Sequence, residues 1–243
     1  MSFNLLCLPF AGGNKFSYRK YEEKAPANLR IIPLEYPGRG SRGREPLLPE
    51  LNLLVEDIYH QASPYIAQGG YAIYGHSLGA LVAMQLARKI ISHHQPPPLH
   101  LFVSGAAGPS SLCFRQKQRH RLERNTFIAE ITRFDGSPQE ILQNEEFIDY
   151  IEPVLRADFR AVETYQHEET APLMLPVTVI NGTEDTEIER LDISLWQKET
   201  NYPVEFVSMP GNHFFIFDAP AQITRLMANK LQLTVKQDNH SAQ

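Results

Sequence analysis

The segment Gly75-His76-Ser77-Leu78-Gly79 constrains the fold of this chain more than any other. The apolar residues 71–74 before it predict a buried strand, and residues 80–88 after it predict a helix. A strand, a sharp turn and a helix around G-x-S-x-G form a nucleophile elbow, in which the glycines permit a strained turn and a close approach of the two elements. The hydroxyl of Ser77 is therefore expected at a helix N-terminus, above the edge of a sheet.

A serine nucleophile needs a base and an acid that orients the base, and in α/β hydrolases the chain order is Ser, Asp or Glu, then His. Residues 176–180, a β-branched run, predict a strand downstream of Ser77, and a turn follows it. Asp185 in this turn is the expected acid. The neighbourhood is acidic, and Glu184 and Glu187 are the alternatives.

The expected general base is His213, because it lies on a loop just after a second apolar run at residues 204–207. Gly211 permits a tight turn before it, and the aromatic residues 214–215 after it could exclude water. Most of the other histidines lie in polar or Pro-rich stretches typical of solvated surface residues. His76, inside the elbow, is expected to pack beside the nucleophile.

Stabilisation of an oxyanion requires two backbone N–H groups, and the elbow supplies one of them at Leu78. The second is expected from the small-residue loop 9–13, which follows an expected strand at residues 3–8. We assign this donor to Ala11, with Phe10 and Gly12 as alternatives.

The pattern along the chain predicts a single α/β domain over residues 1–243, built on a mainly parallel sheet with helices on both faces. The expected strands lie near residues 3–8, 30–35, 71–75, 99–104, 176–181 and 203–208. Between about 109 and 172 no strand is evident, and apolar residues recur at helical spacing, with interruptions at residues 135–138 and at Pro153. This stretch predicts an inserted helical lid. The polar tail 236–243 is expected to lack regular structure.

Composition excludes several classes of function. The net charge of −5 gives no indication of nucleic-acid binding, and no run of about 20 apolar residues indicates a membrane span. The N-terminus lacks the features of a signal peptide, and the two cysteines do not form a disulfide framework, so we expect a cytoplasmic protein. No metal site is evident, and nothing indicates an obligate assembly, so a monomer is expected.

Six blocks in order along the chain resemble the type II thioesterases, the external enzymes that accompany polyketide synthases and non-ribosomal peptide synthetases. The blocks are residues 9–13, Tyr36-Pro37-Gly38-Arg39 with Arg42, Gly75 to Ala80, Leu155-Arg156-Ala157-Asp158, Gly182 with Asp185, and Gly211 to Phe215. The departures are small: Leu78 stands where many members have Met, and Asn212 stands where a second Gly is usual. Asn212 could alter how the His213 loop sits.

The resemblance implies an α/β-hydrolase fold and hydrolysis of acyl groups held as thioesters on the phosphopantetheine arm of acyl or peptidyl carrier proteins. The usual task in this family is editing, which clears stalled or misprimed units, and no cofactor is implied beyond the arm that the substrate carries. Arg39, Arg42 and Arg44 are candidate contacts for the arm's phosphate or for an acidic carrier, the alternative being a solvated loop. Two other functions stay open, a small-molecule esterase or fatty-acyl thioesterase on the same fold and a non-catalytic carrier-binding module.

Overall fold

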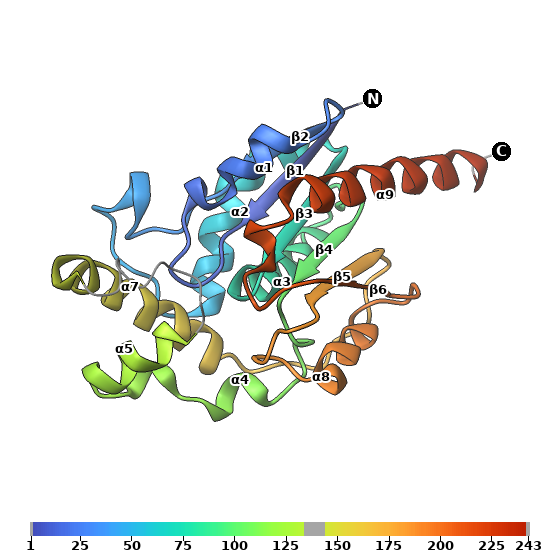
Figure 1. Ribbon diagram of the computed structural model, residues 1–243. Helices are drawn as coiled ribbons and strands as arrows, with labels where there is room; N and C mark the ends of the chain where they lie inside the picture. Colours follow the sequence, from blue (N-terminus) through green and yellow to red (C-terminus); the bar gives the residue numbers. More distant parts are fainter. Residues whose placement is uncertain (1, 134–143, 242–243) are drawn as a thin grey trace.

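Six parallel strands form the central sheet of the computed structural model, which describes residues 2–133 and 144–241 (Figure 1). The strands are β1 (Phe3–Leu8), β2 (Leu29–Pro33), β3 (Tyr71–His76), β4 (Leu101–Ser104), β5 (Val177–Gly182) and β6 (Glu205–Met209). Their order across the sheet is β2-β1-β3-β4-β5-β6, and every neighbouring pair is parallel. The expected strands and the parallel sheet are confirmed, with strand ends that shift by no more than two residues.

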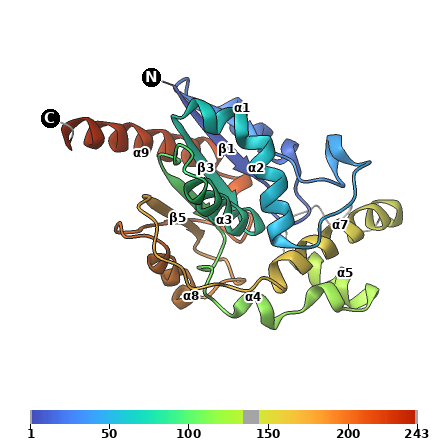
Figure 2. The same cartoon turned by 180° about the vertical axis from the view of Figure 1, so that it is seen from behind.

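Helices cover both faces of the sheet, as the alternation of elements predicted (Figures 1 and 2). Helices α2 (Leu51–Gln68) and α3 (Leu78–Ser92) pack on one face, and α1 (Arg19–Lys24) and α9 (Pro220–Ser241) pack on the other. Shorter elements connect these layers: η1 (Lys15–Tyr18), η2 (Gly40–Arg42), α8 (Arg190–Ser194), η4 (Leu195–Glu199) and η5 (Phe215–Phe217).

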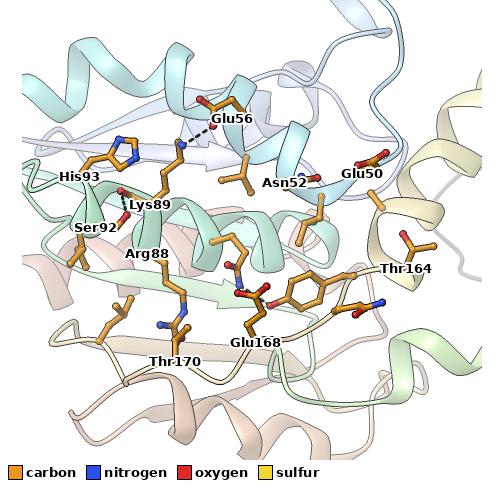
Figure 3. A pocket seen from close by; sticks show the side chains of 18 of the residues that line it. Glu50, Asn52, Glu56, Arg88, Lys89, Ser92, His93, Thr164, Glu168 and Thr170 are labelled. Atoms are coloured by element: carbon orange, nitrogen blue, oxygen red, sulfur yellow. Dashed lines mark hydrogen bonds and ion pairs between the residues drawn. The ribbon is translucent and has the colours of Figure 1, made fainter.

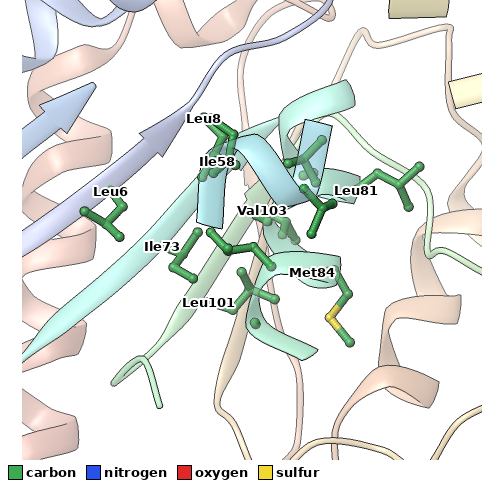
Figure 4. Packing of buried hydrophobic residues seen from close by; sticks show 14 of the residues in the cluster. Leu6, Leu8, Ile58, Ile73, Leu81, Met84, Leu101 and Val103 are labelled. Carbon is green, nitrogen blue, oxygen red and sulfur yellow. The ribbon is translucent and has the colours of Figure 1, made fainter. Parts of the chain in front are cut away.

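Strand β1 contributes side chains to the hydrophobic cores on both faces of the sheet. Leu6 and Leu8 point to the face of α2 and α3, whereas Leu5 and Cys7 point to the face of α1 and α9, as the two-residue period of a strand requires. All four side chains are fully buried. Figure 4 shows Leu6 and Leu8 with side chains from the neighbouring strands and helices in the first of these cores. A near-continuous apolar run is what a strand covered on both sides needs.

The segment between β4 and β5 contains four helical elements among its described residues, joined by irregular stretches. It contains α4 (Cys113–Gln116), η3 (Arg119–Arg121), α5 (Arg124–Thr132) and α7 (Glu145–Glu163), gathered at the end of the sheet where the strands finish (Figures 1 and 2). The interruption expected at residues 135–138 lies outside the described residues. The one expected at Pro153 is wrong, because α7 continues through it. Proline has no N–H group, so the carbonyl of Asp149, four residues earlier, lacks its helical hydrogen bond. Both residues lie on the exposed side of α7, where water can bind that carbonyl.

The expectation for the C-terminal tail is also wrong for the part that the structure describes. Helix α9 extends through residue 236 to Ser241. Its earlier turns are anchored by the buried Ile223, Met227 and Leu231, and adding residues to an existing helix is easy for side chains such as Lys and Gln. Within the described residues, no helix is both long and apolar enough to cross a membrane.

Candidate active site

Ser77 occupies a strained turn between β3 and α3. Its backbone has φ 54° and ψ −117°, which non-glycine residues rarely adopt, and α3 begins at the next residue. Cβ atoms would not fit at the flanking glycines, since one at Gly75 would lie 2.0 Å from the Gly79 carbonyl oxygen and one at Gly79 would lie 2.3 Å from the Leu8 carbonyl oxygen. The elbow expected from the motif is therefore present, for the steric reason that the motif implies.

Asp185 and His213 form a hydrogen-bonded pair beyond the ends of β5 and β6. The Asp185 Oδ2 atom lies 2.8 Å from the His213 Nδ1 atom, and both side chains are almost completely buried. A carboxylate next to Nδ1 accepts a hydrogen bond from the Nδ1–H group. In the neutral ring, this tautomer leaves Nε2 unprotonated and able to accept a proton. The other carboxylate oxygen of Asp185 accepts from the Glu187 N–H at 2.9 Å, so the acid is held at both of its oxygens.

The two competing carboxylates have other positions. Glu184 is exposed. Glu187 pairs with Lys117 at 2.6 Å and with Arg119 at 2.7 Å. Burial by itself would raise the pKa of Glu187, but these two cations outweigh burial and hold the pKa below its ordinary value. Of the three acidic candidates, Asp185 is the one hydrogen-bonded to His213.

The His213 loop accommodates Asn212, which the sequence analysis noted as a departure from the family pattern. The Asn212 side-chain oxygen accepts a hydrogen bond from the Phe214 N–H at 2.9 Å, which is the local turn that Asn favours. Gly211 supplies the positive φ, at 116°. The substitution noted in the sequence is thus absorbed by a side-chain bond within the loop.

The expected oxyanion donors lie at the elbow and on the loop after β1. Leu78 is the first residue of α3, so its N–H has no acceptor in the preceding turn. Ala11 lines the same small cavity as Ser77 and His213. Gly12 is excluded as an alternative because its N–H donates to the Asp158 carboxylate at 2.7 Å.

This cavity, of about 70 Å³, connects the elbow to the inserted helices. Phe159 and Val162 from α7 and Ile188 from the loop after β5 give it an apolar wall. Around these stand charged residues that also line it: Lys117, Arg119, Glu163 and Glu187. Cys113, to which the sequence analysis gave no role in the site, also lines the cavity.

Asp158 is a key residue of this region to which sequence reasoning gave no role. It is fully buried on α7, and its carboxylate binds the Arg39 guanidinium through two hydrogen bonds of 2.5 and 2.7 Å as well as the Gly12 N–H. A signal was present, because Asp158 stands in helical register with the apolar Leu155 and Val162, and a charge on a buried face requires a partner.

The expectation that Arg39 contacts a carrier is wrong, since its side chain is 2% exposed and committed to Asp158. Arg42 is about one-fifth exposed, and it binds Asp57 at 2.6 and 2.7 Å. Arg44 lies exposed on the same loop. The basic loop thus divides into one buried structural arginine, one partly buried paired arginine and one exposed arginine.

A larger cleft, of about 970 Å³, lies elsewhere, between α2, α3 and the end of α7 (Figure 3). Two of the cations that line it have carboxylate partners: Lys89 binds Glu56 at 2.7 Å, and Arg88 binds Glu199 at 2.7 Å. Neither Ser77 nor His213 lines it. Of these two cavities, the smaller is therefore the one lined by the expected nucleophile and base.

A serine on a strained elbow, an aspartate–histidine pair beyond later strands and a parallel sheet of this order define a serine hydrolase with the α/β-hydrolase fold. Comparison with known proteins identifies the branch of that class. The Thioesterase domain family matches residues 3–231. The gramicidin S biosynthesis protein GrsT of Aneurinibacillus migulanus is 32% identical over 231 residues, which cover 95% of this chain and 90% of GrsT.

Two solved structures agree with this result. ClbQ from the colibactin NRPS/PKS pathway superposes with a TM-score of 0.89 at 29% identity, covering 96% of this chain and 98% of ClbQ. The type II thioesterase BorB from the borrelidin biosynthetic cluster superposes with a TM-score of 0.84 at 27% identity, covering 95% of this chain and 93% of BorB. The chain belongs to the thioesterase family, in its type II class, and the resemblance seen in the sequence is confirmed.

Proposed function

We propose that this protein hydrolyses acyl groups held as thioesters on the phosphopantetheine arm of acyl or peptidyl carrier proteins, with Ser77, His213 and Asp185 as its catalytic triad. The observation that carries the proposal is the Asp185–His213 hydrogen bond of 2.8 Å beside a cavity that Ser77 also lines. Membership of the type II class supports a carrier-bound substrate. Such substrates are assembled inside the cell, so the proposal places the protein in the cytoplasm.

The first half of the proposed reaction forms an acyl-enzyme. His213 Nε2 takes the Ser77 Oγ proton as Oγ attacks the thioester carbonyl carbon, and the N–H groups of Leu78 and Ala11 stabilise the resulting oxyanion. Collapse of the tetrahedral intermediate breaks the carbon–sulfur bond, and the thiol leaves with the proton that His213 holds. Because a thiol has a pKa of about 8.5, this leaving group needs less help than an amine would.

In the second half, His213 takes a proton from water, whose oxygen attacks the acyl carbon. The ester bond to Ser77 Oγ breaks, Oγ regains a proton from His213, and the free acid leaves. Asp185 stays ionised throughout, and it stabilises the protonated form of His213.

The inserted helices act in this proposal as a lid over the acyl group. A dry cavity of ~150 Å³ holds a molecule of benzene, which has six carbon atoms. The cavity beside Ser77 has about half that volume, so without movement of the lid it accommodates an acyl group of only a few carbon atoms. In this proposal, longer acyl groups require a shift of α7, whose Phe159 and Val162 line the cavity.

Intact-protein mass spectrometry of acyl-loaded carrier protein tests the proposal, with acetyl, medium-chain and long-chain loads and with a Ser77→Ala control. Loss of the acyl mass and recovery of the holo-carrier, only with Ser77 present, is the expected result. Cleavage of simple esters or free acyl thioesters with no preference for the carrier would indicate the esterase or fatty-acyl alternative. Binding of carrier without any cleavage would indicate a non-catalytic module.

Arg42 and Arg44 are the remaining candidates for contact with the phosphate of the arm or with an acidic carrier surface. The exposed Arg44 is the better test, because changing Arg42 also breaks its pair with Asp57. We expect Arg44→Glu to raise KM for acyl-carrier substrate and to leave turnover of a free acyl thioester unchanged. Unchanged KM for the carrier substrate would remove Arg44 from the proposal.

A further inference from the structure

His76 is a fully buried histidine whose ring packs against His213. It is the last residue of β3, directly before the nucleophile. The centroids of the two imidazole rings lie 5.0 Å apart, with an angle of 47° between the planes. The sequence predicted that His76 packs beside the nucleophile, and the structure shows that it also contacts the expected base.

A chain of hydroxyl groups fixes the orientation of this ring. His76 Nδ1 lies 2.9 Å from Ser104 Oγ, which in turn lies 2.9 Å from the Tyr74 hydroxyl. The backbone around the ring leaves no spare room, since a Cβ atom at Gly105 would lie 2.3 Å from His76 Cε1. Gly105 also has a positive φ of 54°, so two features of this position require glycine.

His76 is held in its uncharged form. Burial, and secondarily the nearby charge of His213, lower the pKa of His76 well below its ordinary value. The titratable groups that face the ring are His213 and, through Ser104, Tyr74. Its Nε2 atom has no hydrogen-bond partner among the residues that the structure describes.

We propose that His76 is a positioning residue for His213, a hydrogen-bonded ring that holds the plane of the base while the base gains and loses a proton. The inference rests on the proposed catalytic role of His213. The Asp185 hydrogen bond fixes one edge of the His213 ring, and the rings of His76 and Phe214 pack against it with centroids 5.0 and 5.2 Å away. The ring of His76 restrains rotation about the Asp185 hydrogen bond from the side, and its dipole provides a polar neighbour where water is excluded.

The test is His76→Leu, with His100→Leu as the matched control. His100 is also buried, bonds one hydroxyl through its Nε2 atom (Thr178 Oγ1, 2.8 Å) and leaves its Nδ1 atom unpartnered among the described residues. It precedes β4, however, at the end of the sheet opposite the elbow. The two substitutions therefore remove the same kind of group, one beside His213 and one away from it.

With an acyl-N-acetylcysteamine thioester as the probe, we expect His76→Leu to lower kcat/KM by ~10–100-fold, mainly through kcat, as a small misplacement of a catalytic group does. His76→Gln, which can still bond Ser104, should recover part of the rate. His100→Leu should lower the melting temperature without lowering kcat.

Ser104→Ala, with Thr178→Val as its control, keeps the inference testable if His76→Leu does not fold. It removes the bond to His76 Nδ1 and leaves the ring in place, so a smaller change in the same direction is expected. Wild-type values of kcat and kcat/KM in the folded variants would overturn the inference. If Ser77→Ala and His213→Ala abolish turnover in the same assay while His76→Leu does not, the triad stands and the role of His76 alone fails; if those two retain turnover, the triad itself is wrong.

Discussion

Removal of the Asp158 carboxylate should destabilise the protein strongly. In Asp158→Ala, the Arg39 guanidinium stays buried at 2% exposure without its counter-ion, and the Gly12 N–H loses its acceptor. Breaking a buried ion pair from one side costs about 3–5 kcal/mol in free energy of unfolding. In a chain of 243 residues, about 1 kcal/mol corresponds to roughly 2–4 °C in Tm, so the expected fall is about 6–20 °C.

Asp149→Ala is the matched control on the same helix. Asp149 pairs with Arg124 at 2.5 Å, but the two side chains are 67% and 45% exposed, and solvent screening leaves such an exposed pair with little effect on stability. Thermal unfolding followed by circular dichroism measures both variants. Asp158→Asn should be intermediate, because its side-chain oxygen can still accept from the Gly12 N–H while the charge is lost.

A double substitution separates charge burial from packing. In Arg39→Met with Asp158→Leu, no charge is left unpaired, so much of the lost stability should return. Below its Tm, Asp158→Ala should lose less activity than the ~10²–10³-fold that follows loss of an oxyanion donor, because the bond is to Gly12 and the assigned donor is Ala11. If Asp158→Ala melts as close to the wild type as Asp149→Ala does, the account of a buried, uncompensated arginine is wrong.

Three further predictions concern the site. Asp185→Asn should lower kcat by about 10⁴-fold with little change in Tm, as loss of the acid does in serine hydrolases. An equal loss of kcat in Glu184→Gln would show that Asp185 is not the acid. The lowered pKa of Glu187 means that its pairing stabilises the fold above the ordinary glutamate pKa and is lost as pH falls through the lowered value; the Tm difference between wild type and Glu187→Gln should therefore shrink in acid, and a constant difference would argue against these pairs. Iodoacetamide should alkylate Cys113 in the cavity lining and block turnover, and it should not inhibit the Cys113→Ala variant. Burial raises the pKa of Cys7, so peptide mass spectrometry should find that thiol unmodified. Labelling of Cys7 before Cys113 would contradict the placement of Cys113 in the cavity lining.

The elbow and the sheet could be predicted because their signals are local. G-x-S-x-G between a strand and a helix describes a steric requirement that a few neighbouring residues satisfy, and Ser77 meets it. The six strands followed from runs of apolar and β-branched residues. Asp185 could be chosen from its place after a strand, but only the structure distinguishes it from Glu184 and Glu187 by its bond to His213.

Interactions between distant parts of the chain account for what sequence reasoning missed. Arg39 stands in a basic, glycine-rich loop, which is typical of solvent-exposed segments. Its partner Asp158 lies 119 residues further along the chain, and no local pattern reports that distance. The interruption predicted at Pro153 was wrong for a related reason. The packing of α7 on its neighbours outweighs the loss of one backbone hydrogen bond.

The bonds that join the inserted helices to the rest of the protein limit how this enzyme can be re-engineered. An exchange of residues 109–172 for the same stretch of a relative would aim to change which acyl groups are accepted. The exchanged segment, however, contains one half of several pairs whose other halves stay behind: Asp158 with Arg39, Lys117 and Arg119 with Glu187, and Tyr165 with Gln85. A chimera that keeps these partners matched should fold, whereas one that separates Asp158 from Arg39 is left with a buried charge that has no counter-ion. Residues 109–172 can therefore be exchanged only together with their partner residues in the rest of the chain.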